Sequence, residues 1–298
     1  MGPERWDRRS FVRASLAFGA AAIASGAPSA SSAEASFQVL DLEVKGPLAS
    51  RASLLVPKHL PAKAEVRLLV ALHGLGESGD PALGVRAWLD LYGLRTSYER
   101  LLAPPIARTS KRKDWTDGRL AEVNESLRRE PFAGLAVVCP FTPNVRKMTD
   151  SAASQRKYGD WIVNDLIPAA RSRAPVASTA AATAIDGCSM GGPIALETVA
   201  AHPAAFGAVG VVQPALGTAR AASFAKALAA AREKNASLAI HLLTSQGDPF
   251  LAATRALAKE LGARSVPHTL RVSPGPHDQP WLRETGTIEM LLFHERGR

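Results

Sequence analysis

The residues with the clearest potential for chemistry form a G-x-S-x-G pattern over residues 187–191, with Ser189 at its centre. The pattern directly follows an apolar run over 181–186 and directly precedes a helix-like segment that starts at Pro193. A serine at such a strand-to-helix turn has its Oγ lifted out of the sheet, and the flanking glycines leave room for the strained backbone. The pattern therefore predicts that Ser189 is the nucleophile of an acyl transfer.

Acyl transfer also needs hydrogen-bond donors for the oxyanion that develops on the substrate. We expect one donor to be the N–H of Met190, which follows the nucleophile at a helix N-terminus. The other is expected from the loop after an earlier strand, where the apolar run 67–72 leads into H-G-L-G at 73–76. The N–H of Leu75 is the candidate there, and His73 is interpreted as structural. An ordinary glycine-rich turn is the alternative interpretation of this loop.

The general base and its orienting acid should follow Ser189 in the order Asp or Glu, then His, each after a strand. The only two aspartates after Ser189 are Asp248 and Asp278. Asp248 stands in G-D-P just past the apolar run 238–243, where the acid is expected. Asp278 is the chain neighbour of His277, and neighbouring side chains point in different directions. We therefore predict Asp248 as the acid.

Three histidines follow Asp248, at positions 268, 277 and 294. His277 lies in P-G-P-H-D after the strand-like run 269–272, on a loop that proline makes rigid. His268 begins a strand-like run and His294 lies in a terminal helical pattern, so both are interpreted as packing or surface residues. We predict His277 as the base that takes the Ser189 proton.

Other chemistries are not indicated. Cys188 is interpreted as a small side chain beneath the turn, and Cys139 ends a strand that we expect to be separated from Cys188 by another, too far for a disulfide. No His/Asp cluster has metal-ligand spacing, and no G-x-x-x-x-G-K-[ST] phosphate loop occurs. We expect no metal and no cofactor.

These residues must be positioned by a regular framework. Strand-like segments are expected at 37–45, 51–56, 66–72, 134–139, 181–186, 207–213, 238–244 and 268–272. Helical patterns are expected at 158–169, 193–201, 219–233, 249–261 and 281–295. This alternation predicts an α/β fold with a mostly parallel central sheet of about eight strands and helices on both faces. Ligands bind such sheets at the carboxyl ends of the strands.

The segment around 76–133 is longer than a strand-to-strand crossover needs. Its apolar residues favour one or two helices, followed by a polar loop at 107–119. We interpret the segment as an insertion, either a partial lid or a decorated crossover. The basic run 111–113 within it is interpreted as a solvated loop.

The composition of the chain limits the classes of protein to which it can belong. The chain has 298 residues, 46% of them hydrophobic and 21% charged, with a net charge of +9, so it can bury a full core. Lys and Arg are scattered and alternate with acids, so a nucleic-acid partner is not indicated.

The N-terminal residues 1–33 have the order of a signal peptide: a basic start, a short Ala-rich apolar stretch and a small-residue cleavage-like site. Residues 7–13 resemble the twin-arginine motif, which implies the Tat export machinery as a partner. The apolar stretch is too short for a membrane anchor. An unstructured basic segment is the alternative. Removal of residues 1–33 takes away four arginines and two acids, which lowers the net charge from +9 to +7.

The motifs at 73–76, 187–192, 247–249 and 276–278 occur in an order that resembles the α/β-hydrolase superfamily. Within it, residues 158–168, 187–192, 201–206 and 277–281 resemble the putative-esterase family of esterase D, feruloyl esterases and antigen 85. The resemblance implies a cofactor-free serine esterase or acyltransferase with oxyanion donors at Leu75 and Met190. The long 74–133 segment and Pro276 depart from the family's pattern, which leaves the substrate class open.

We therefore expect a signal peptide at 1–33 and a hydrolase domain at 34–298 that is periplasmic or secreted. Its predicted activity is cleavage of carboxylic esters, small or polymer-linked, through Ser189, His277 and Asp248. An acyltransferase or serine peptidase with the same three residues is an alternative. A non-catalytic relative that binds carbohydrates or surfaces is another, although it would be free to lose these residues.

Overall fold

The computed structural model describes residues 36–61 and 64–296, and the predicted signal peptide lies outside them. Its central element is an eight-stranded sheet in the order β1-β2-β4-β3-β5-β6-β7-β8. Strands β1 and β2 pair antiparallel, β2 and β4 pair antiparallel, and the remaining neighbours are parallel. The strands are β1 Phe37–Glu43, β2 Arg51–Pro57, β3 Leu68–Leu72, β4 Ala136–Pro140, β5 Thr183–Cys188, β6 Ala208–Val212, β7 Ala239–Gly247 and β8 Thr269–Pro276.

The inner strands are continuous apolar runs because helices cover both of their faces. All five residues of β3 are fully buried, and they alternate between two hydrophobic clusters. Leu68, Val70 and Leu72 belong to one cluster, whereas Leu69 and Ala71 belong to the other. The sheet therefore separates two cores.

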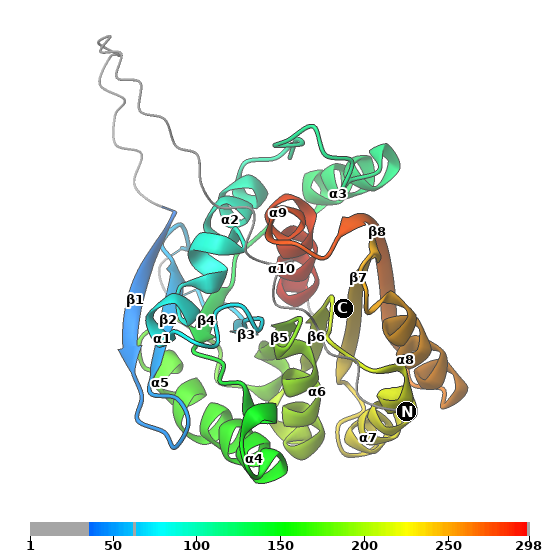
Figure 1. Ribbon diagram of the computed structural model, residues 1–298. Helices are drawn as coiled ribbons and strands as arrows, with labels where there is room; N and C mark the ends of the chain where they lie inside the picture. The colour runs from blue at the N-terminus through cyan, green and yellow to red at the C-terminus, as the bar shows by residue number, and fades with distance from the viewer. Residues whose placement is uncertain (1–35, 62–63, 297–298) are drawn as a thin grey trace, which may run out of the picture. The chain divides into compact units, whose positions relative to one another are not determined.

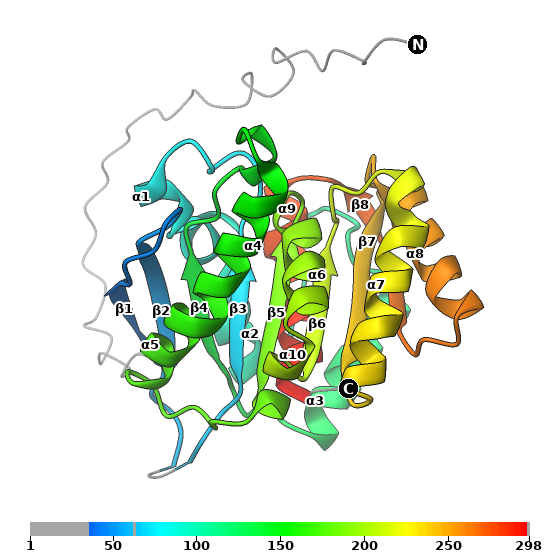
Figure 2. The ribbon, with the colours of Figure 1, turned by 90° about the horizontal axis from the view of Figure 1, so that it is seen from below.

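Two helical layers complete these cores (Figures 1 and 2). Helices α4, α6 and α7 cover one face, and α2 and α10 cover the other, behind the sheet in Figure 2. The helices are α1 Pro81–Gly84, α2 Leu94–Leu102, α3 Asp117–Arg129, α4 Ser151–Trp161, α5 Ile167–Arg171, α6 Gly191–Ala201, α7 Ala221–Lys234, α8 Leu251–Ala263, α9 Gln279–Trp281 and α10 Thr287–Arg296. The π-helical turns are η2 Ala87–Leu91, η4 Ile162–Leu166 and η8 Leu282–Gly286.

The long segment between β3 and β4 supplies part of the second layer. Trp88 from η2, Tyr98 from α2 and Leu127 from α3 are buried in the same cluster as Met290 of α10. Helices α2 and α3 therefore have apolar faces that need α10 and the sheet as partners. They serve as structural cover for this face of the sheet.

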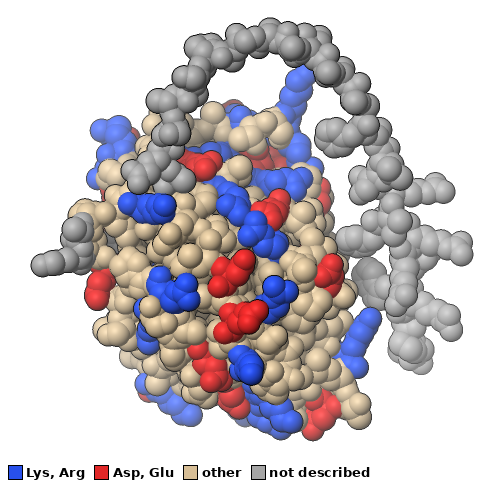
Figure 3. Space-filling view, turned by 90° about the vertical axis from the view of Figure 1, so that its left-hand side faces the viewer, with Lys and Arg blue, Asp and Glu red and all other residues tan. Residues whose placement is uncertain are grey.

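Charged side chains are mixed on the face that contains β1. Figure 3 shows Lys and Arg interspersed with Asp and Glu over that face. None of the helices in the described part of the chain is long and apolar enough to cross a membrane.

The structure confirms the predicted fold class. Each of the eight expected strand segments corresponds to one strand of the sheet, and the ends differ by a few residues. Cys139 of β4 and Cys188 of β5 are both buried and unbridged, and β3 lies between their strands. The expected helix at 158–169 is longer than predicted, since α4, η4 and α5 continue through Pro168 as far as Arg171.

Candidate active site

Ser189 lies in a strained turn between β5 and α6. Its φ is +51°, in the left-handed region that a non-glycine residue rarely adopts. The turn is tight enough that a Cβ on Gly187 would lie 2.1 Å from the carbonyl oxygen of Gly191. Glycine at 187 therefore lets the start of α6 pack directly against the end of β5. The side chain of Ser189 is partly exposed at the carboxyl end of the strand.

The structure brings Ser189, His277 and Asp248 into one hydrogen-bonded row. The Nε2 of His277 lies 3.2 Å from the Oγ of Ser189, and its Nδ1 lies 2.9 Å from Oδ1 of Asp248. A carboxylate can only accept, so Nδ1 carries the hydrogen and Nε2 is free to accept the hydroxyl proton. The His277 side chain is 21% exposed, whereas that of Asp248 is fully buried. This arrangement can transfer a proton from the serine to the imidazole.

The Asp248 carboxylate is fixed by two further donors. The hydroxyl of Thr244, on β7, donates to Oδ2, and the backbone N–H of Phe250 donates to Oδ1 over 3.0 Å. The ring of Phe250 also packs edge-on against His277, with 5.6 Å between ring centroids. These contacts orient the carboxylate and the imidazole together.

Asp278 is engaged elsewhere. Its two oxygens each accept a hydrogen bond from Arg112 over 3.0 Å, and Oδ1 also caps α9 by accepting from the N–H of Trp281. The guanidinium of Arg112 also pairs with buried Asp114. Arg112 is therefore ion-paired and only 32% exposed, and is not fully solvated as the interpretation of the run 111–113 expected.

The candidate oxyanion donors flank the serine. An added Cβ on Gly74 would lie 3.5 Å from Cβ of Ser189, so the loop that contains Leu75 lies against Ser189. Met190 directly precedes α6. Within residues 36–61 and 64–296, the backbone N–H groups of Leu75 and Met190 donate no hydrogen bond. Both therefore have donor capacity for a substrate oxygen.

A buried network that the sequence did not indicate supports this loop. The Tyr92 hydroxyl donates to the carboxylate of Glu77 and accepts from the N–H of Gly74 over 3.1 Å. Gln279, two residues after His277, donates to the other oxygen of Glu77 over 3.2 Å. Glu77 is 5% exposed and Tyr92 is 3% exposed. The network thus joins the Leu75 loop to the segment that follows the histidine.

Other histidines and the cysteine lie in structural positions. The Nε2 of buried His73 accepts from the N–H of Thr142 over 2.8 Å, which ties the ends of β3 and β4, and burial lowers its pKa to about 4. His294 is fully buried against Asp186. Burial, together with nearby carboxylates, raises the pKa of the Cys188 thiol well above its usual range, so this thiol stays neutral.

Sequence signals for the supporting residues were weak. Thr244 and Glu77 each lie at or just after the carboxyl end of a strand, where polar residues can reach a site. Phe250 and Tyr92 follow the apolar pattern of ordinary core residues. Only their contacts in the folded protein show that they support the site. No described group of three or more His, Cys, Asp or Glu side chains is placed to hold a metal ion.

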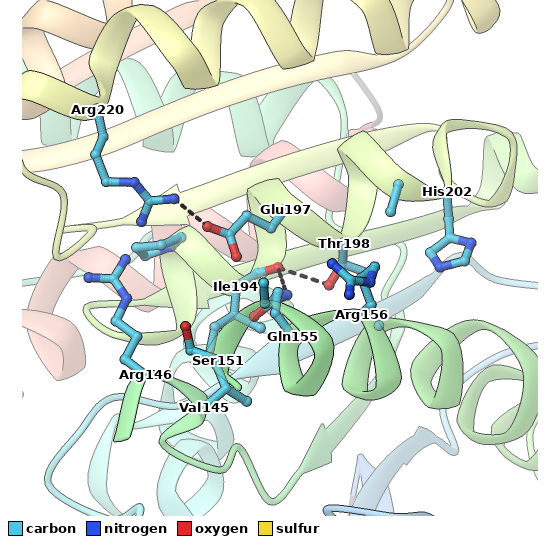
Figure 4. Close-up of a pocket in the computed structure, with 14 residues that line it drawn as sticks. Val145, Arg146, Ser151, Gln155, Arg156, Ile194, Glu197, Thr198, His202 and Arg220 are labelled. Carbon is cyan, nitrogen blue, oxygen red and sulfur yellow. Dashed lines mark hydrogen bonds and ion pairs between the residues drawn. The ribbon is translucent and has the colours of Figure 1, made fainter. Parts of the chain in front are cut away.

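A groove between α4 and α6 is separate from this group (Figure 4). Arg220 pairs there with Glu197 at one end. The side chains of Gln155 and Thr198 both donate to the backbone oxygen of Ile194. None of the three hydrogen-bonded residues of the row lines the groove. The groove is therefore not part of the candidate active site.

Part of the chain matches a known protein family. The family model described as putative esterase matches residues 140–285, a segment that contains Ser189, Asp248 and His277. No curated protein sequence matches the chain.

Solved structures match over most of the chain. A ferulic acid esterase has a TM-score of 0.65 at 16% identity and covers 89% of this chain and 99% of its own. A mutant feruloyl esterase module from Clostridium thermocellum, complexed with sinapinate, has a TM-score of 0.61 at 14% identity, with 94% and 97% covered. S-formylglutathione hydrolase from Staphylococcus aureus has a TM-score of 0.58 at 14% identity, with 87% and 97% covered. At these identities the structures show a shared fold.

The fold is thus that of the α/β-hydrolase-type feruloyl esterases, as predicted. The match over residues 140–285 indicates that the chain is an enzyme of the esterase type.

Proposed function

We propose that the chain is a serine hydrolase that cleaves carboxylic esters through Ser189, His277 and Asp248. The observation that carries the proposal is the hydrogen-bonded row from the Ser189 hydroxyl through both nitrogens of His277 to a buried carboxylate. Such a row activates a hydroxyl that is a poor nucleophile on its own.

The reaction follows from these positions. The Ser189 Oγ attacks the ester carbonyl carbon as its proton passes to Nε2 of His277. The N–H groups of Leu75 and Met190 stabilise the oxyanion. The bond to the alcohol then breaks, and the departing oxygen takes the proton from His277. Water attacks the acyl-enzyme and gives a proton to His277, which returns it to Ser189 as the acid product leaves.

A fluorophosphonate probe tests the nucleophile. The protein without residues 1–33 should become labelled, and Ser189→Ala should lose the label, because in the part of the chain that the structure describes Ser189 is the hydroxyl that lies against Nε2 of His277. Ser53→Ala provides a matched control, and its label should persist, since Ser53 is a buried hydroxyl on β2. Equal labelling of the wild type and Ser189→Ala, or none at all, would contradict the proposal.

An ester panel tests the substrate class. Short p-nitrophenyl esters, feruloyl esters and peptides should be compared by kcat/KM, because the similar solved structures include feruloyl esterases. The proposal requires turnover of at least one ester. Hydrolysis of peptides alone would contradict it.

We also propose export, on the basis of the basic and apolar order of residues 1–33. In a bacterial host with a twin-arginine pathway, the full chain should be found outside the cytoplasm in a shortened form. Replacement of Arg8 and Arg9 by lysine should retain the full-length protein inside. Unchanged distribution of this variant would contradict twin-arginine export.

A further inference from the structure

Gln213 occupies an unusual position directly after β6. It is 1% exposed and has a φ of +46°, in the left-handed region that favours glycine. Its backbone N–H donates to the carbonyl oxygen of Leu243 on β7 over 2.7 Å. A buried glutamine in a strained conformation needs compensation from its surroundings.

The neighbours of Gln213 hold the nucleophile by its backbone. The N–H of Ser189 donates to the carbonyl oxygen of Val212 over 3.0 Å, and the N–H of Ala215 donates to the carbonyl oxygen of Ser189 over 2.8 Å. The turn at 212–215 therefore fixes both backbone polar groups of Ser189. Any shift of this turn moves the nucleophile.

The side chain of Gln213 reaches the other two residues of the row. Its amide nitrogen donates to the Ser245 hydroxyl over 2.7 Å and to the carbonyl oxygen of Pro276 over 2.9 Å. Pro276 is bonded directly to His277. The Ser245 hydroxyl also donates to the Pro276 oxygen over 3.3 Å, and the backbone oxygen of Ser245 accepts from the N–H of Asp248 over 3.2 Å.

We propose that Gln213 is a positioning residue that holds the Ser189, Asp248 and His277 loops in register. The inference rests on the proposed esterase function. A single buried amide links the ends of β6, β7 and β8, with both of its hydrogens directed at named acceptors. Displacement of about 1 Å at a reacting group is enough to lower turnover strongly, so this linkage acts on kcat.

Two substitutions at Gln213 test the effect of its hydrogen bonds apart from the effect of its side-chain volume. Gln213→Glu has nearly the same shape but presents oxygen to the Pro276 oxygen, and Gln213→Leu removes both donors. Each should lower kcat for p-nitrophenyl acetate by roughly 10- to 100-fold and leave KM within about twofold, because substrate contacts are intact. Gln38→Leu, at an exposed position of β1, is the control and should keep the wild-type kcat.

Should the buried substitutions prevent folding, Gln213→Gly keeps the test decisive, because glycine adopts a positive φ without strain. This variant should fold, with urea unfolding as the measurement, and still show the loss of kcat. A folded Gln213→Gly with wild-type kcat would overturn the inference.

The His277→Ala background distinguishes positioning from general destabilisation. If Gln213 acts by positioning the three residues, whose joint effect is lost once His277 is removed, then Gln213→Leu should not lower the small residual rate of His277→Ala any further. The same fold-loss in both backgrounds would overturn the inference. If the wild type is labelled at Ser189 and the Gln213 variants keep the full kcat, the result contradicts this inference and not the proposed function. Wild-type protein without label or turnover contradicts the proposed function on which it rests.

Discussion

Asp248 and Asp278 follow the same nucleophile but differ in what their carboxylates contact. Asp248 accepts from His277, whereas Asp278 pairs with Arg112 and caps α9. Asp248→Asn places an amide against Nδ1, which favours the wrong tautomer, so kcat should fall about 1,000-fold or more. Asp278→Asn loses only a partly exposed ion pair, so kcat should fall less than about tenfold. Steady-state kinetics with p-nitrophenyl acetate ranks the two, and the reverse order would assign the acid to Asp278.

These residue positions were predictable because Ser189, Asp248 and His277 each follow a strand-like run. In a parallel sheet the carboxyl ends of such strands meet at one edge, so residues far apart in the chain come together. The pairing of Arg112 with Asp278 was not predictable in this way. Asp278 lies 166 positions later, and no local pattern links the two. The charge run 111–113 alone indicated only exposure to solvent.

At the scale of elements, the segment between β3 and β4 shows where pattern reasoning stops. Its apolar residues indicated helices, and α2 and α3 are present. Whether they form a lid or a layer depends on the apolar face of α10, and that pairing is not visible in either segment alone. Tyr98, Leu127 and Met290 belong to one buried cluster on this face of the sheet.

The same segment also supports the candidate oxyanion loop through Tyr92. Tyr92→Phe removes the acceptor for the N–H of Gly74 and a donor to buried Glu77. We expect kcat to fall roughly tenfold with little change in KM, since an oxyanion donor acts mainly in the transition state. The free energy of unfolding should also fall, by about 1–3 kcal/mol, because buried polar groups lose partners. Kinetics and urea unfolding measure the two effects.

Tyr98→Phe is the matched control for this prediction. The Tyr98 hydroxyl is also buried and bridges the N–H and carbonyl of one residue, Leu135, just before β4. Its loss should destabilise the protein to a similar extent and leave kcat unchanged. If both variants lose the same share of kcat, the effect of Tyr92 is one of general stability and not of the loop.

At the scale of the whole molecule, the sheet order could be expected only through the family resemblance. Strand-like runs locate strands in the chain, but β4 lies between β2 and β3, out of sequence order. That order depends on how the 76–133 segment crosses the sheet. It places β5, β6, β7 and β8 side by side, and these are the strands from whose ends the candidate site is built.

The two cores also bury titratable groups that couple folding to pH. Burial lowers the pKa of His73 to about 4 and that of His241 to about 3, from an ordinary value of 6.5. Below pH 6.5 the unfolded chain binds protons on these histidines that the folded chain does not bind. Their stabilisation is therefore complete above pH 6.5 and is lost as the pH falls. At pH 5 the loss is roughly 2 kcal/mol for each histidine.

The buried pair of Asp186 and His294 behaves differently. Burial raises the pKa of Asp186 well above its usual range and lowers that of His294 to about 3. A raised carboxyl pKa stabilises the folded state at low pH and this stabilisation is lost as the pH rises, whereas a lowered histidine pKa acts in the opposite direction. The two shifts therefore oppose each other within the pair.

Because of His73 and His241, the free energy of unfolding should fall as the pH drops below about 6.5, as measured by urea unfolding from pH 4.5 to 9. His241→Gln should make the acid side less steep, because one of the two groups that cause it is removed. His268→Gln, at a partly exposed position, is the control and should keep the wild-type profile. A profile that His241→Gln leaves unchanged would place the loss of stability in acid outside this buried group.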